Sequence, residues 1–140
     1  MNKSVNFSDQ EIRATYNIGH FGNDLITVIF QPEVLWDPID IDRQAELLFG
    51  DIVAIYQEHP KTVFDGLVDL SLLGKEAKVS LGARKKYAEL MKNKQMGRLA
   101  FVGVSQFLKF VINLLVKASK KKDAVRLFDS KAEAMAWLKK

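Results

Sequence analysis

The chain has 140 residues, of which 48% are hydrophobic, and this size suits one domain with its own core over residues 1–140. It contains no cysteine, which excludes disulfides, thiolate metal sites and cysteine nucleophiles and favours a cytoplasmic protein. The net charge is +4. Residues 1–10 are expected to form a flexible N-terminus. No apolar run approaches the ~20 residues of a membrane-spanning helix.

The first two predicted elements are strands that form a hairpin. Residues 11–18 alternate between apolar and polar side chains, and residues 24–30 are a β-branched apolar run. The segment 19–23, Gly-His-Phe-Gly-Asn, has the composition of a turn between them.

From residue 42 onward the pattern predicts helices alternating with strands. Apolar residues at spacings of three and four predict a helix over 42–58, and strands are expected over 62–70, 98–103 and 124–128. Further helices are expected over 80–93 and 105–119, the latter with Ser105 as N-cap, and a Ser130-x-x-Glu133 capping box opens a closing helix. The order β-β-α-β-α-β-α-β-α predicts an α/β fold with a single mixed sheet, parallel except for an antiparallel edge.

No pattern of residues indicates a catalytic or metal site. The histidines, His20 and His59, have no third ligand at a metal-like spacing and are interpreted as surface or turn residues. Ser105 follows Gly103 as in a nucleophile elbow, but the second glycine is missing and capping explains it better. Turn or cap roles are likewise assigned to Asp65, Asp69 and Asp129. We therefore expect a non-enzymatic protein without cofactor or metal.

The helix over 105–119 has more apolar surface than packing on one side of a sheet requires. On a helical wheel its apolar residues cover about 240°, whereas one-sided packing needs an arc only somewhat over 100°. Neighbouring helices, a homodimer partner, a lipophilic ligand or a membrane could bury the surplus. A lysine stripe that runs into Lys120-Lys121-Lys122 favours an anionic membrane surface, at ~1 kcal/mol for each lysine. The predicted membrane or ligand contacts are Phe107, Lys109, Phe110, Val111, Leu114, Lys117, Lys120, Lys121 and Lys122.

Nucleic acid is not favoured as a partner. The basic run 120–122 has aliphatic neighbours, and the aromatic residues that would stack on bases are missing there.

Three segments resemble the STAS-like, or SpoIIAA-like, domain family, which are relatives of the anti-sigma-factor antagonists. They are Phe64-Asp65-Gly66-Leu67-Val68-Asp69-Leu70-Ser71, then Leu99-Ala100-Phe101-Val102-Gly103-Val104-Ser105, and Val125-Arg126-Leu127-Phe128-Asp129 followed by Glu133-Ala134-Met135-Ala136-Trp137-Leu138. The resemblance implies a sheet with helices mostly on one face, and a fold similar to that of lipid-binding CRAL-TRIO domains.

In the antagonists, the serine that becomes phosphorylated begins a helix, and this helix follows a strand that ends in Asp-Leu-Ser. The resemblance therefore implies a phosphorylated serine at the corresponding place in this chain. Asp69-Leu70-Ser71 is present, but the later segment reads Val79-Ser80-Leu81-Gly82, without the family's aspartate, so Ser80 is the one candidate phosphorylation site.

The leading hypothesis is a binding module that takes a lipophilic ligand or associates peripherally with the inner membrane surface through the helix 105–119. The alternative is a protein-protein regulator of the antagonist type that acts through Ser80.

Overall fold

The protein is built on one five-stranded sheet. A computed structural model describes residues 6–22 and 24–140 of the chain. The strands β1 (Tyr16–Phe21), β2 (Leu25–Phe30), β3 (Phe64–Asp69), β4 (Met96–Val102) and β5 (Val125–Phe128) lie side by side in that order. β1 is antiparallel to β2, and all other neighbours are parallel. The mixed sheet with an antiparallel edge is therefore confirmed.

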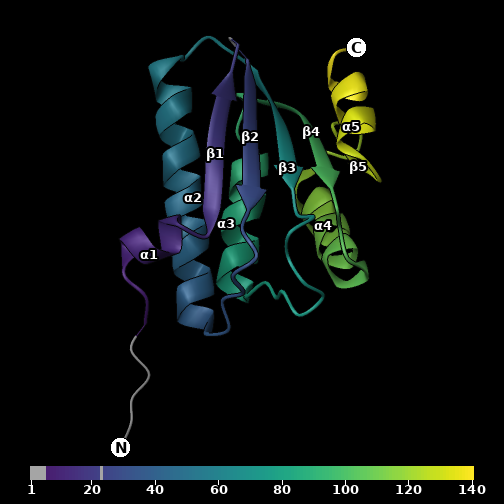
Figure 1. Cartoon of the computed structure of the whole chain (residues 1–140). Coiled ribbons are helices and arrows are strands. Elements are labelled where there is room, and N and C mark those ends of the chain that lie inside the picture. The colour runs from purple at the N-terminus through teal and green to yellow at the C-terminus, as the bar shows by residue number, and fades with distance from the viewer. Residues whose placement is uncertain (1–5, 23) are drawn as a thin grey trace, which may run out of the picture.

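The helices are divided unequally between the two faces of the sheet (Figure 1). α2 (Pro38–Glu58), α3 (Leu81–Met91) and α4 (Gln106–Ser119) cover one face, whereas the short α5 (Lys131–Leu138) packs on β3, β4 and β5 from the other. α1 (Asp9–Arg13) lies beside α2. The expectation that the helices lie mostly on one face is confirmed.

Serine side chains define the starts of the helices that follow β3, β4 and β5. Ser80, Ser105 and Ser130 each have extended backbone and accept a hydrogen bond from the N–H three residues later. For Ser105 this N–H belongs to Leu108, at 3.3 Å, which confirms the capping role. At Ser130 the Glu133 carboxylate accepts from the serine hydroxyl at 3.2 Å, where a full capping box would have it accept from the backbone N–H.

The predicted hairpin is confirmed, but the strand predicted over residues 11–18 is confirmed only for residues 16–18. Residues 9–13 form α1, which begins with a reciprocal capping box between Ser8 and Glu11 and buries Ile12 completely. β1 begins only at Tyr16 and continues through Phe21, which pairs with Leu25, so the turn is shorter than the predicted segment 19–23. Residue 23 lies outside the described residues.

The N-terminal segment is held against α2 where the structure describes it. Arg43 donates to both carboxylate oxygens of Asp9, at 2.8 and 2.7 Å, and the N–H of Phe7 donates to Asp40 at 3.2 Å. These contacts attach residues 7 and 9 to α2, while the flexibility of residues 1–10 stays a prediction; residues 1–5 lie outside the described residues. α2 itself begins at Pro38, four residues before the predicted start, because Asp37 caps it.

Candidate functional site

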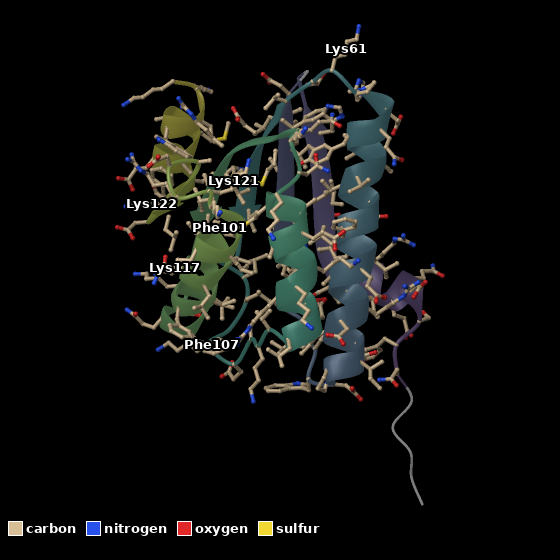
Figure 2. All side chains as sticks on the ribbon, turned by 180° about the vertical axis from the view of Figure 1, so that it is seen from behind. Lys61, Phe101, Phe107, Lys117, Lys121 and Lys122 are labelled. Carbon is tan, nitrogen blue, oxygen red and sulfur yellow. The ribbon has the colours of Figure 1, made fainter. Side chains whose placement is uncertain are left out.

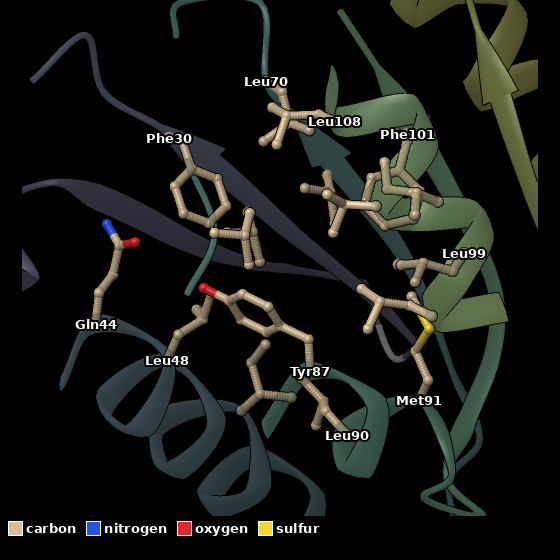
Figure 3. A pocket seen from close by; sticks show the side chains of 18 of the residues that line it. Phe30, Gln44, Leu48, Leu70, Tyr87, Leu90, Met91, Leu99, Phe101 and Leu108 are labelled. Carbon is tan, nitrogen blue, oxygen red and sulfur yellow. The ribbon is translucent and has the colours of Figure 1, made fainter. Parts of the chain in front are cut away.

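An apolar cavity of about 180 Å³ lies between the sheet and the three helices that cover one face (Figure 3). The inner faces of β2, β3 and β4 form its floor, and α2, α3 and α4 form its walls. An engineered cavity of about 150 Å³ with a similar aliphatic lining binds benzene in another protein. The space is therefore large enough for a small lipophilic molecule. Its labelled side chains in Figure 3 are Phe30, Gln44, Leu48, Leu70, Tyr87, Leu90, Met91, Leu99, Phe101 and Leu108.

Two residues on the inner strands show that this side of the sheet is not filled. Val68 of β3 and Leu99 of β4 lie on strands with a neighbour on both sides, beneath a layer of helices, yet both are only half-buried. Interior side chains in such positions are normally close-packed. Their exposed surface faces the cavity.

The cavity approaches solvent at the carboxyl ends of the parallel strands. Two charged lining residues, Glu33 and Lys78, are exposed, and they lie in the loops that follow β2 and β3. In open α/β sheets, ligands bind at this edge. The same loops and the helix starts that follow them carry a set of exposed large apolar residues, namely Trp36, Ile39, Leu72 and Leu81.

α4 presents apolar side chains both to the cavity and to the outside. Leu108, Val111, Ile112 and Leu115 are buried and line the cavity. On the outer side, Phe107, Phe110 and Leu114 are 41%, 59% and 41% exposed. The wide apolar arc expected from the sequence is therefore real, and about half of it is covered.

The predicted contact residues divide between these two sides of α4. Val111 is only 2% exposed, so it can contact a ligand in the cavity but not a membrane. Phe107, Phe110 and Leu114 form an outer stripe at spacings of three and four, which we call the α4 outer stripe. Figure 2 shows Phe107 at one end of the helix and Lys117, Lys121 and Lys122 toward the other. Lys109, Lys117, Lys120 and Lys122 are exposed and Lys121 is half-buried.

Ser80 is engaged by a carboxylate. Its hydroxyl donates a hydrogen bond to Asp42 of α2 while accepting from the N–H of Ala83. A Cβ at Gly82 would collide with the same Asp42 carboxylate, so α2 and α3 approach closely here. A phosphate on Ser80 would bring additional negative charge against Asp42.

The remaining candidate residues have structural partners. Asp65 accepts from the N–H of Arg98 at 2.9 Å and Asp69 from the N–H of Ser71 at 2.9 Å. His20 and His59 are both exposed, and the centroids of their rings lie 5.4 Å apart, beside Phe64. The sequence did not indicate that these two histidines lie together. Within residues 6–22 and 24–140, no three His, Asp or Glu side chains are placed to hold a metal ion.

Sequence reasoning missed the cavity and most of its lining. The sequence analysis does not single out Gln44 or Tyr87, although both line the cavity. The one available signal was the tyrosine at position 87, a residue with a polar tip on the apolar side of the helix 80–93. No periodicity reveals that the volumes of facing side chains leave a gap.

A family model described as Domain of unknown function (DUF7793) matches residues 57–140, more than half of the chain. The chain belongs to this family. The matched part begins at the end of α2 and includes α3, α4 and the strands β3, β4 and β5. No curated protein matches the chain.

A solved structure shows the same fold. It is the crystal structure of an uncharacterized protein of the DUF3478 family with a SpoIIAA-like fold, from Shewanella loihica PV-4. The match has a TM-score of 0.53 at 19% sequence identity and covers 88% of this chain and 91% of that chain. The fold is therefore SpoIIAA-like, as the sequence resemblance implied. Among the described residues, no helix is both long and apolar enough to cross a membrane.

Proposed function

We propose that the protein is a non-enzymatic module that binds a lipophilic small molecule in the cavity between the sheet and α2, α3 and α4. The observation that carries the proposal is an apolar space of about 180 Å³ inside the core, where protein side chains are normally close-packed. Each methylene of a ligand that moves from water into the cavity contributes ~0.8 kcal/mol to binding, so a ligand with several carbons gains affinity from burial alone.

The mouth of the cavity supports this proposal. The exposed apolar residues Trp36, Ile39, Leu72 and Leu81 stand at the strand edge where Glu33 and Lys78 mark the opening. Apolar groups there lower the cost of transferring a lipophilic molecule from an aggregate or a bilayer into the cavity.

Binding of the neutral fluorophore N-phenyl-1-naphthylamine tests the proposal. Wild type should bind one equivalent with increased emission, and n-octane should displace it. Val68→Phe places a ring in the cavity and should abolish binding, whereas the matched control Phe110→Ser, on the outer side of α4, should leave it unchanged. Wild type that binds no fluorophore, or Val68→Phe that binds it normally, would refute the proposal.

A second function is supported by the α4 outer stripe. Phe107, Phe110 and Leu114 are exposed beside the lysines of α4 and of the run 120–122, an arrangement that suits docking on an anionic bilayer. Burying three large apolar side chains at ~2 kcal/mol each would support reversible association.

Sedimentation with vesicles containing phosphatidylglycerol tests the second function. Wild type should co-sediment at low salt and be released as salt rises, because lysine attraction is screened over ~10 Å at 0.1 M. Phe110→Ser should weaken this association while keeping fluorophore binding, and Val68→Phe should do the reverse. Wild type that ignores the vesicles at low salt would eliminate membrane docking without touching the cavity proposal.

A further inference from the structure

We infer that the cavity is built for a neutral ligand with a hydroxyl group, which Tyr87 and Gln44 hydrogen-bond on the α2 side of the cavity. This inference rests on the proposed function, because it names the chemical class of ligand for the same cavity.

Tyr87 offers the first polar group. Figure 3 shows its hydroxyl pointing into the cavity, and none of the hydrogen bonds among the described residues involves it. Burial raises the pKa of this hydroxyl above its usual range, so it stays protonated and remains able to donate. Tyr87 is half-buried, and the open space beside its hydroxyl can hold a polar partner. The missing partner of Tyr87 is assigned to the ligand.

Gln44 offers the second polar group, and its orientation is fixed from outside the cavity. Its amide nitrogen donates to the Thr15 hydroxyl at 2.8 Å, and that hydroxyl in turn donates to the carbonyl of Ile12 at 2.5 Å. Thr15 therefore requires a donor from Gln44, so the amide oxygen is the atom left on the cavity side, as Figure 3 shows. Within the described part of the chain nothing donates to this oxygen.

The two groups lie on the same side of the cavity. Tyr87 packs against the small cluster of Leu35, Ile41, Ala45 and Ala83, and Ala45 follows Gln44 on α2. A ligand hydroxyl can accept a hydrogen bond from Tyr87 and donate one to Gln44. A ketone can only accept the bond from Tyr87, and a hydrocarbon can make neither bond.

An anionic head group does not suit this position. The charged residues of the lining are Glu33, Asp65 and Lys78; Glu33 and Lys78 are exposed at the mouth, and Asp65 accepts from the N–H of Arg98. None of the lining residues is a buried cation, so the lining would not compensate the desolvation of a carboxylate beside Tyr87. The ligand class is therefore a neutral alcohol with an apolar body.

Displacement of N-phenyl-1-naphthylamine by 1-octanol, n-octane and octanoate at pH 8 tests the inference. Tyr87→Phe should weaken binding of 1-octanol about tenfold, the size of one net hydrogen bond, and leave n-octane unchanged. Gln44→Met should weaken 1-octanol but not 2-octanone, which has no hydroxyl to donate. Octanoate should bind at least tenfold more weakly than 1-octanol to wild type.

Tyr56→Phe is the matched control. Tyr56 also lines the cavity and its hydroxyl has no hydrogen-bond partner among the described residues, but Tyr56 stacks on Phe64 at the amino end of β3, twelve residues from Gln44 along α2. It should leave both 1-octanol and n-octane binding unchanged. The inference is overturned if Tyr87→Phe weakens both probes equally or neither, or if octanoate binds as well as 1-octanol. If n-octane and 1-octanol both fail to displace the fluorophore from wild type, the proposed function itself fails.

Discussion

The two faces of the sheet are packed in different ways. On the α5 side, a small buried cluster has half-buried neighbours such as Leu25 and Trp137, and a space of about 70 Å³ borders Leu67. On the side of α2, α3 and α4, a larger core with half-buried neighbours such as Val68 and Leu99 surrounds a cavity of about 180 Å³. The two faces therefore differ in the size of the unfilled space, and the larger space lies beneath α2, α3 and α4.

The largest expected effect comes from two leucine truncations on opposite faces. Leu138→Ala should lower the free energy of unfolding by ~2 to 5 kcal/mol, because Leu138 is buried in the α5-side cluster and its removal leaves a new void. Leu99→Ala should cost clearly less, since Leu99 already borders empty space. Urea denaturation of both variants measures the difference, and equal losses would show that the two faces are packed alike.

Adding volume should give the same order, with the larger loss of stability again on the α5 side. Val102→Phe on the α5 side should cost ~1 to 3 kcal/mol through overpacking. Val68→Phe on the cavity side should leave stability within ~0.5 kcal/mol of wild type, because the ring enters the cavity. Thermal unfolding of the two variants at matched concentration tests this prediction, and a Val68→Phe loss as large as that of Val102→Phe would count against the cavity.

A hydrogen-bonded carboxylate beside the antiparallel edge of the sheet should have a smaller, pH-dependent effect on the free energy of unfolding. This effect should not depend on the packing of either face of the sheet. Although burial raises the pKa of the Asp51 carboxyl, hydrogen bonds from Arg13 at 2.9 Å and Tyr16 at 2.7 Å outweigh it and lower this pKa. Because the pKa of Asp51 is lower in the folded state, the ionised carboxyl stabilises the fold at pH values above its unfolded pKa of ~3.9. This stabilisation is lost as pH falls through the folded pKa.

Asp51→Asn should therefore cost less than about 1 kcal/mol at pH 7, because the carboxyl is partly exposed, and the difference from wild type should shrink as pH falls below about 4. Denaturation between pH 7 and pH 3 measures it. A difference that persists unchanged at pH 3 would mean that the ion pair with Arg13 is not its source.

The smallest effect is expected on the outer side of α4. Phe110→Ser should change stability by no more than ~0.5 kcal/mol, because the side chain is 59% exposed, whereas Leu115→Ser on the cavity side of the same helix should cost ~2 to 5 kcal/mol. Circular dichroism melts of both variants compare the two sides. A Phe110→Ser loss close to that of Leu115→Ser would mean that the α4 outer stripe is covered in solution.

Much of the fold could be predicted because its signals are local. The serine caps at Ser105 and Ser130 and the wide apolar arc of the helix 105–119 are properties of short segments, and the structure confirms them. The N-terminal helix was missed because an apparent alternation over 11–18 was preferred to the Ser8–Glu11 capping signal. The cavity was missed for a different reason. It depends on how side chains from six segments fill a shared volume, and no single segment carries that information.

The most direct test of the central claim is a titration of the methyl-labelled protein with 1-octanol, followed by two-dimensional NMR. The account predicts saturable shifts with one equivalent bound for the methyl groups of Leu48, Val111 and Ile112, which line the cavity. The methyl groups of Ala134 and Leu138, on the α5 side, should not shift. Shifts that fail to saturate, or that are equally large on both faces of the sheet, would contradict the claim that the protein binds a lipophilic ligand in this cavity.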